Sequence, residues 1–231
     1  MSLIPFGRSS KVGVPTDLIS HPRLTASIVR IIFGGWTEAL TRGPPPTPMR
    51  EEEGMNGALA QGMRASVQAL RLTNVEVFET PGERSDPTLE VPDVEPDVIL
   101  VVAQFAHRLL LRAIIECKRL DPLQSPQRDL RRDYVRKGMD RFISERYGRG
   151  RQLCFMVGYV LRQNGAAAMA DINVHLQTVG RTADCLAVAQ RFDQVGFVGE
   201  SAHERLGDGP RLTLLHTFLV FPAAGPGLSD D

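Results

Sequence analysis

The sequence LLLRAIIECK at residues 109–118 is an apolar run that ends in an acid, a cysteine and a lysine. Its first seven residues are almost continuously apolar, as expected of a strand that is buried on both faces. Because side chains alternate along a strand, Glu116 and Lys118 point to one face and Cys117 to the other. A carboxylate and an ammonium at the end of a buried strand lose water, which is costly unless they are paired or bind an ion.

A second acid precedes this strand in the sequence. Asp97 stands in EPDVIL at residues 95–100, at the start of another segment with the composition of a strand. We therefore expect Asp97, Glu116 and Lys118 to converge at one edge of a central sheet. A metal ion would offset the cost of gathering these acids.

The composition predicts a single folded domain. A chain of 231 residues with 42% hydrophobic content can bury one substantial core. No apolar stretch approaches the roughly 18 to 20 residues of a membrane span, and residues 1–15 lack the organisation of a signal peptide, so we expect a cytoplasmic protein without membrane contact. The three cysteines, Cys117, Cys154 and Cys185, have no zinc-ligand spacing and fit buried small hydrophobic residues.

The net charge of zero conceals a marked asymmetry along the chain. Residues 51–97 contain eleven acids and three bases, whereas residues 128–151 contain nine bases and four acids. The basic segment could meet phosphates, and its alternative is a solvated helix face.

Periodicity and chain-breaking residues predict an α/β fold with the order helix, strand, strand, strand, helix, strand. The expected elements, in chain order, are helices at 24–40 and about 48–72, strands at 75–79, 98–103 and 107–118, a helix at 127–147, a strand at 153–161, a helix at 166–176 and a strand at 211–221. We expect an N-terminal helical extension and linker at 1–47, a main domain at 48–221 and a flexible tail at 222–231.

The Pro96-Asp97 pair followed by Glu116-x-Lys118, in this element order, resembles the PD-(D/E)XK, or restriction-endonuclease-like, nuclease superfamily. The resemblance covers about half of the chain and implies a central mixed sheet flanked by helices. A narrower resemblance, to small nuclease domains of bacterial defence loci, depends on Tyr134, Gly138, Arg141 and Phe142, on Tyr147-Gly148 and on Gly158-Tyr159.

This resemblance implies a role for each matched residue. Asp97 and Glu116, with the backbone carbonyl of Cys117, would hold Mg²⁺ or Mn²⁺, and Lys118 would orient the attacking water. Glu52 corresponds to the acid that the superfamily often places on its first helix, with Glu51 and Glu53 as alternatives. The implied activity is metal-dependent endonuclease or exonuclease cleavage of nucleic acid, with DNA as the expected substrate, in defence or DNA processing.

The basic helix adds expected contacts with nucleic acid. Tyr134 and Arg141 share one helical face with Gly138, and Arg141 would clamp a phosphate. Arg131, Arg132 and Arg136 would attract the backbone diffusely or serve only solvation.

Other interpretations stay open for the chain as a whole. The acids and lysine could be ordinary strand-end and helix-start residues, and the protein could be a non-catalytic module that binds nucleic acid. Its N-terminal extension could contact a second copy or a partner protein of a defence complex. His203 and Arg205, with His216, could converge near the site or on a partner surface, although His216 fits a satisfied core histidine better. No motif of a serine hydrolase, zinc protease or nucleotide-driven motor occurs.

Overall fold

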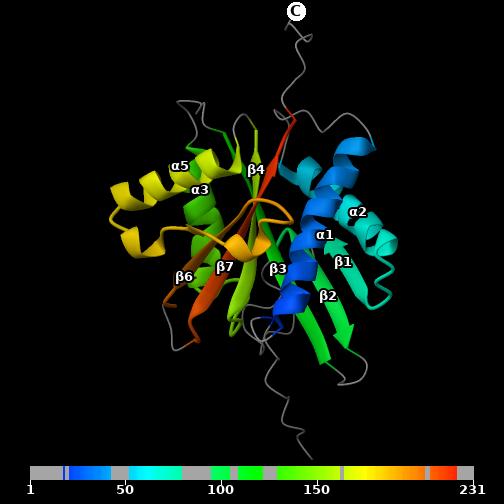
Figure 1. Cartoon of the computed structure of the whole chain (residues 1–231). Coiled ribbons are helices and arrows are strands. Elements are labelled where there is room, and N and C mark those ends of the chain that lie inside the picture. The colour runs from blue at the N-terminus through cyan, green and yellow to red at the C-terminus, as the bar shows by residue number, and fades with distance from the viewer. Residues whose placement is uncertain are drawn as a thin grey trace, which may run out of the picture.

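A seven-stranded mixed sheet lies at the centre of the molecule, with helices on both faces (Figure 1). The computed structural model describes residues 18, 21–42, 52–79, 95–104, 109–121, 129–161, 164–205 and 209–222. The helices are α1 (Pro22–Thr41), α2 (Glu52–Ala69), α3 (Leu130–Tyr134), the π-turn η3 (Val135–Met139), α4 (Asp140–Ile143), α5 (Gly165–Thr178) and the short turns η4 (Thr182–Asp184) and η5 (Gln190–Phe192). The strands are β1 (Val75–Glu79), β2 (Val98–Gln104), β3 (Leu109–Leu120), β4 (Leu153–Val160), β5 (Ala187–Val188), β6 (Val198–His203) and β7 (Leu212–Val220).

The sheet combines an antiparallel meander with a parallel centre. Its strand order is β1-β2-β3-β4-β7-β6-β5. The pairs β1–β2 and β2–β3 are antiparallel, β3–β4 and β4–β7 are parallel, and β7–β6 and β6–β5 are antiparallel. The protein is thus an α/β protein in which two N-terminal helices precede the sheet, and the predicted order of helices and strands is confirmed as far as β4. Strands β5 and β6 were not predicted.

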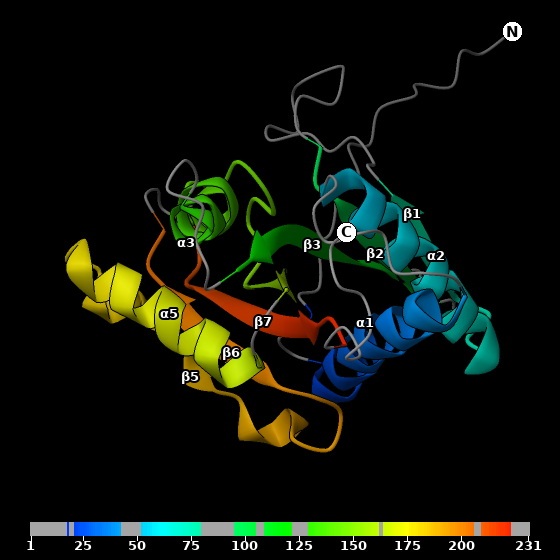
Figure 2. The same ribbon diagram turned by 90° about the horizontal axis from the view of Figure 1, so that it is seen from above.

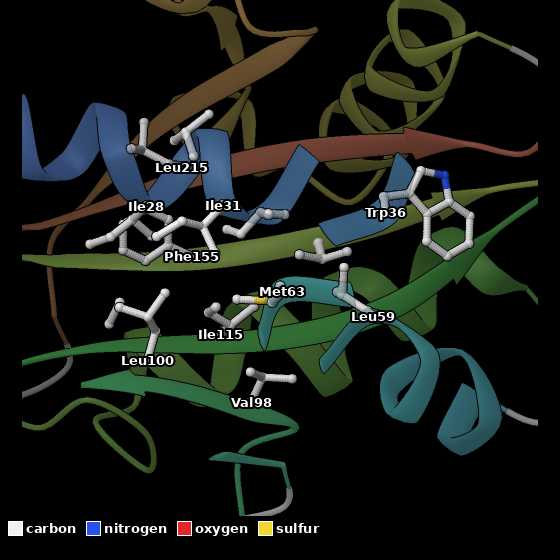
Figure 3. Packing of buried hydrophobic residues seen from close by; sticks show 14 of the residues in the cluster. Ile28, Ile31, Trp36, Leu59, Met63, Val98, Leu100, Ile115, Phe155 and Leu215 are labelled. Atoms are coloured by element: carbon white, nitrogen blue, oxygen red, sulfur yellow. The ribbon is translucent and has the colours of Figure 1, made fainter. Parts of the chain in front are cut away.

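Alternate residues of the central strands pack against different helices. Ile115, Phe155 and Leu215 belong to the core under α1 and α2, as Figure 3 shows. Their chain neighbours Ile114, Cys154 and Leu214 belong to the core under α3, η3, α4 and α5. Figure 2 shows the sheet between these two helical layers. Both faces are therefore dry, which explains why β4 is buried at every position.

Helix α1 packs directly on α2 and on the sheet. Trp36 donates a hydrogen bond from Nε1 to the Val220 carbonyl at 3.0 Å. At the crossing of α1 and α2, a Cβ on Gly62 would lie 1.9 Å from the Gly35 carbonyl oxygen, so only glycine permits this approach. Of the predicted N-terminal extension and linker at 1–47, residues 1–17, 19–20 and 43–47 lie outside the described residues, as does the predicted tail after residue 222.

The basic helix is shorter and less regular than predicted. Asp129 caps its N-terminus by accepting hydrogen bonds from the backbone N–H groups of Arg131 and Arg132, and α4 ends at Ile143. Between these points the chain makes the π-turn η3 around Gly138. A Cβ at Gly138 would lie 2.4 Å from the Met156 terminal methyl, so the glycine allows this turn to pack closely on β4. Within the described parts of the chain, no helix is long and apolar enough to cross a membrane.

Candidate active site

The predicted site lies where β2 stops beside β3. The register pairs Val98, the first residue of β2, with Ile115, whereas β3 continues to Leu120. The backbone of β3 beyond Ile115 therefore has no β2 partner. Asp97 fills part of this gap, because its Oδ2 accepts a hydrogen bond from the Cys117 backbone N–H at 2.7 Å.

Lys118 lies at the centre of the site, and its ammonium is surrounded by oxygen atoms. Its Nζ is 2.8 Å from Glu52 Oε1, 2.9 Å from Glu116 Oε1 and 3.7 Å from Asp97 Oδ2. The Cys117 carbonyl oxygen accepts a fourth contact at 2.6 Å. The structure thus brings together all four predicted catalytic side chains and the predicted backbone ligand. We call these four oxygens and the ammonium the Lys118 cluster.

The start of α2 supplies the acid of the Lys118 cluster that comes from a helix. Glu52 is the first residue of α2, and its second carboxylate oxygen accepts a hydrogen bond from the Arg119 backbone N–H at 3.4 Å. Glu53, one position further round the helix, is exposed to solvent. Glu51 lies outside the described residues. Among the described candidates, the helix phase therefore selects Glu52.

Burial dominates the electrostatics of the Lys118 cluster. The Glu116 side chain is 1% exposed, and burial raises its pKa to about 7, with Lys118 opposing the shift and Asp97 adding to it. Burial likewise raises the pKa of Asp97, although Lys118 acts against it. For Lys118, burial lowers the pKa, but Glu116, Asp97 and Glu52 together outweigh burial and leave the pKa raised. The Lys118 ammonium therefore stays charged, and the three carboxylates share it as a counter-ion.

The chemistry of the donors fits a hard divalent cation. All four atoms around Lys118 Nζ are oxygens, and the ammonium already occupies a position where positive charge is stabilised. Glu116 Oε2 is buried and has no hydrogen-bond partner, so it remains open to a further electropositive atom. Among the described residues, no group of three or more histidine, cysteine or acidic side chains is placed to hold a metal ion. A fit therefore involves the smaller set of Asp97, Glu116 and the Cys117 carbonyl.

Asp97 is held in place by two polar side chains to which sequence analysis gave no role at the site. Asn56 donates from Nδ2 to Asp97 Oδ1 at 2.9 Å, and Tyr159 donates its hydroxyl proton to Asn56 Oδ1 at 3.0 Å. Asn56 follows Glu52 by one helical turn, so the two side chains lie on the same face of α2. That spacing was a signal in the sequence that could have identified Asn56.

Arg141 contacts the site through an ion pair with Glu116, so its guanidinium is not free. Its NH1 is 2.7 Å from Glu116 Oε1 and donates to the Tyr147 hydroxyl at 2.9 Å. Tyr147 donates in turn to the Glu95 carbonyl at 3.0 Å. The Arg141 side chain is still 30% exposed, so part of it faces the solvent beside the buried acid.

Tyr134 does not join the site, in contrast to its predicted contact with nucleic acid. It is fully buried, and its hydroxyl lies 2.9 Å from His216 Nδ1. The helix turns this ring toward the sheet, where a Cβ at Gly158 would lie 3.5 Å from it. Tyr134 therefore serves the core in this structure.

A buried chain of hydrogen bonds runs from Tyr134 across β7 and β6 to Asp184. His216 Nε2 lies 2.8 Å from Ser201 Oγ, which lies 2.7 Å from His203 Nε2, and His203 Nδ1 lies 2.7 Å from Asp184 Oδ1. The order Ser201, His203, Asp184 is that of a hydrolase triad, but Ser201 is 3% exposed and its hydroxyl is shared by two histidines. The prediction that His216 is a satisfied core histidine is confirmed.

Arg205 has a structural position at the end of the basic helix. Its NH1 donates to the Phe142 carbonyl at 3.0 Å, and its NH2 donates to the Gly148 carbonyl at 3.1 Å. Glu145 Oε1 lies 3.3 Å from Arg205 NH1. Arg205 therefore links the end of the basic helix to the loop that follows it, where the Phe142 and Gly148 carbonyls also accept backbone N–H groups. Its side chain is buried and does not lie on a surface that a partner could contact.

Comparisons with protein-family models, curated protein sequences and solved structures give no match for this chain. The functional interpretation consequently depends on the geometry of the Lys118 cluster and on the sequence resemblance.

Proposed function

We propose that the protein is a metal-dependent nuclease of the PD-(D/E)XK type, which hydrolyses phosphodiester bonds with DNA as the expected substrate. The observation that carries the proposal is the Lys118 cluster, in which Glu52, Asp97, Glu116 and the Cys117 carbonyl all lie within 3.7 Å of one ammonium. The antiparallel meander β1-β2-β3, the helical connection and the parallel strand β4 support a restriction-endonuclease-like core. A defence or DNA-processing role follows from the same resemblance.

Asp97, Glu116 and the Cys117 carbonyl are the groups that would hold Mg²⁺ or Mn²⁺. Such an ion, when bound, supplies a water molecule of lowered pKa and stabilises negative charge on the phosphate. The protein's own contribution is to fix these oxygens, because Asp97 is held by the Cys117 N–H and by Asn56. Glu116 is held by Arg141.

Lys118 would act on the reacting groups directly. Its ammonium is kept charged by the surrounding acids, so it can orient the attacking water and offset the charge that develops on the phosphate. Burial makes this charge more effective than it would be in water, because the local dielectric constant is low. Glu52 would keep the ammonium in position from the α2 side.

One observation favours a second candidate function, a non-catalytic binding module that retains the nuclease fold. The carboxylates of the Lys118 cluster already have Lys118 and Arg141 as cationic partners, so the cluster can also be explained as a structural ion-pair network. Such a module would bind nucleic acid or a partner chain without cleaving it.

Cleavage by the purified full chain separates these two functions. We expect labelled single-stranded DNA, duplex DNA or RNA to be cut with Mg²⁺ or Mn²⁺ and to remain intact in EDTA. The Glu116→Gln variant should be slower by about 10²-fold or more. Glu38→Gln, which changes an exposed acid on α1, should be unaffected. Binding of nucleic acid without cleavage under every metal condition would favour the non-catalytic module and contradict the proposed activity.

A further inference from the structure

Helices α3 and α5 lie on the same face of the sheet (Figure 1). Two adjoining cavities lie along the basic helix there. The first, of about 630 Å³, extends from Arg141 past Arg146, and the second, of about 620 Å³, reaches Arg132. Both are lined by Arg136, Asp140 and Arg181, so they form one continuous depression. We call it the basic groove, and Arg141 connects it to Glu116 of the Lys118 cluster.

The π-turn explains why three arginines of the helix meet in this groove. Arg132 and Arg136 are four residues apart, as on one face of an α-helix, but Arg136 and Arg141 are five apart. A π-turn lengthens one helical turn by a residue, so Arg141 returns to the face of Arg136. The three side chains then span about 13 Å of helix axis, a length that carries about four phosphates of one strand in duplex DNA.

Among the described residues of the groove, the acidic side chains have ion-pair partners, whereas several arginines do not. Each of its acids already has a cationic partner: Asp140 and Asp184 pair with Arg181 at 2.7 and 2.6 Å, and Glu204 lies 3.4 Å from Arg211. Within the described parts of the chain, Arg132, Arg136 and Arg146 have no ion pair, and all three are exposed. The net effect is a groove that presents positive charge to solvent.

The neighbouring bases of the helix differ in this respect. Arg131 Nε lies 3.4 Å from its helix-capping acid Asp129, and Lys137 lies 2.9 Å from Asp133. Arg131 also does not line either cavity. Of the three arginines predicted to attract the nucleic-acid backbone diffusely, Arg132 and Arg136 therefore remain candidates and Arg131 does not. Arg146 is added to them.

We propose that the basic groove binds the phosphodiester backbone of the nucleic-acid strand on one side of the scissile bond. This inference rests on the proposed function for the direction of the strand, which would run from the Lys118 cluster along Arg141, Arg136 and Arg132. Within the described residues, neither cavity is lined by phenylalanine, tyrosine or tryptophan, and His175 contributes the one ring, so bases have little stacking surface there. Contacts with phosphates alone carry no sequence information, and binding by this groove is independent of base sequence.

The test compares two triple variants of equal charge change. One is Arg132→Gln, Arg136→Gln and Arg146→Gln in the groove; the other is Arg23→Gln, Arg30→Gln and Arg112→Gln, three exposed arginines elsewhere. Binding to fluorescent single-stranded and duplex DNA and to RNA is measured by anisotropy in EDTA, where no cleavage occurs, over a series of salt concentrations. Two base sequences of each nucleic acid are compared.

The groove variant should bind at least 10-fold more weakly and should flatten the plot of log affinity against log salt by about two units for a single strand. The control variant should stay within about twofold of wild type. The single-strand and duplex arms show which form supplies the phosphates. Equal losses in both variants, an unchanged salt slope in the groove variant, a strong dependence on base sequence, or no nucleic-acid binding by the wild type would overturn the proposal.

Failure of this inference can be distinguished from failure of the proposed function. If the wild type binds through the groove but never cleaves, the groove proposal stands and the nuclease proposal falls. If the wild type cleaves and the groove variant binds with full affinity, the nuclease proposal stands and the strand follows another surface.

Discussion

Lys118 carries the charge that stabilises the folded site and also the charge proposed to act on the phosphate. Its side chain is 7% exposed, and three carboxylates lie within 3.7 Å of its ammonium. Lys118→Ala should reduce cleavage at least 10²-fold, because the group that orients the attacking water is lost, while DNA affinity stays within about twofold. Single-turnover cleavage and anisotropy on the same samples measure both quantities.

The same substitution removes one of the two cations that pair with buried Glu116, so we expect the free energy of unfolding to fall by about 3 kcal/mol. Arg112→Ala, which changes an exposed arginine earlier in the same strand, is the matched control and should change neither cleavage nor stability. A Lys118 variant that cleaves normally would remove the lysine from the chemical step.

Asn56 and Tyr159 allow the position of Asp97 to be tested without removing a charge. Asn56→Ala removes the amide that bonds Asp97 Oδ1, so the Mn²⁺ concentration for half-maximal cleavage should rise by about 10- to 100-fold. The rate at saturating Mn²⁺ should change much less. Tyr159→Phe, which removes only the hydroxyl on Asn56, should shift the Mn²⁺ dependence in the same direction by a smaller amount. Identical Mn²⁺ titrations for wild type and both variants would show that Asn56 does not position Asp97.

The crossing of α1 and α2 depends on a glycine contact. A Cβ at Gly62 would lie 1.9 Å from the Gly35 carbonyl oxygen, a backbone atom that cannot move without separating the helices. Gly62→Ala should therefore lower the free energy of unfolding by about 3 kcal/mol or more in denaturant titrations. Gly54→Ala in the same helix, where a Cβ meets nothing within 4 Å, should be neutral or stabilising by up to about 1 kcal/mol. Equal effects of the two substitutions would contradict this packing.

The buried series of hydrogen bonds from Tyr134 to Asp184, which crosses β7 and β6, makes the free energy of unfolding depend on pH. Burial lowers the pKa of His203 in spite of Asp184, and burial lowers the pKa of His216 well below 6.5. As the pH falls below about 6.5, the unfolded chain binds protons that the folded chain does not, so stability is lost on acidification and restored as pH rises. Each histidine contributes a slope of about 1.4 kcal/mol per pH unit. Glu116 contributes the opposite slope, because its pKa is raised to about 7 and its folded form takes up a proton first, so the histidines are measured in the Glu116→Gln variant.

The physical cause is the order of hydrogen bonds along this chain. With Asp184 ionised and both histidines neutral, every proton from the Tyr134 hydroxyl to His203 Nδ1 has an acceptor. An added proton leaves one buried donor without a partner, which costs about 1 to 3 kcal/mol. Urea titrations from pH 8 to pH 5 at low and high salt measure the slope, which should survive high salt because buried groups are weakly screened. A flat profile in the Glu116→Gln variant would show that the histidines charge freely in the folded protein.

Sequence alone predicted the elements that have strong local signals. Strands β1 to β4 and helix α2 are marked by apolar periodicity and by breaking residues, and their order follows from chain connectivity. Strand β6 has the sequence VGESAH, which lacks apolar alternation, and β5 has only two residues. Both strands form because one edge of β7 is not paired with β4 and can accept β6, which in turn pairs with β5. The local sequence of β5 and β6 does not reveal that such an edge exists.

The residues of the candidate site likewise include some that could be predicted from the sequence and some that could not. Asp97 and Glu116 were predictable because the antiparallel register of β2 and β3 places a strand start opposite a strand end. Tyr134 was assigned to the wrong surface because the π-turn and the packing on Met156 depend on tertiary contact, not on helical spacing. Asn56 could have been found from its one-turn spacing from Glu52, whereas the role of Tyr159 exists only once α2 and β4 are brought together.

For the molecule as a whole, the decisive question is whether the oxygens of the Lys118 cluster bind a divalent cation. Calorimetric titration of Mn²⁺ into the purified full chain measures this without assuming a substrate. Wild type should bind, Asp97→Asn should bind at least 10-fold more weakly, and Lys118→Met should bind at least as tightly as wild type because the competing ammonium is gone. An Asp97→Asn variant with the same Mn²⁺ affinity as wild type would contradict a metal centre at this site.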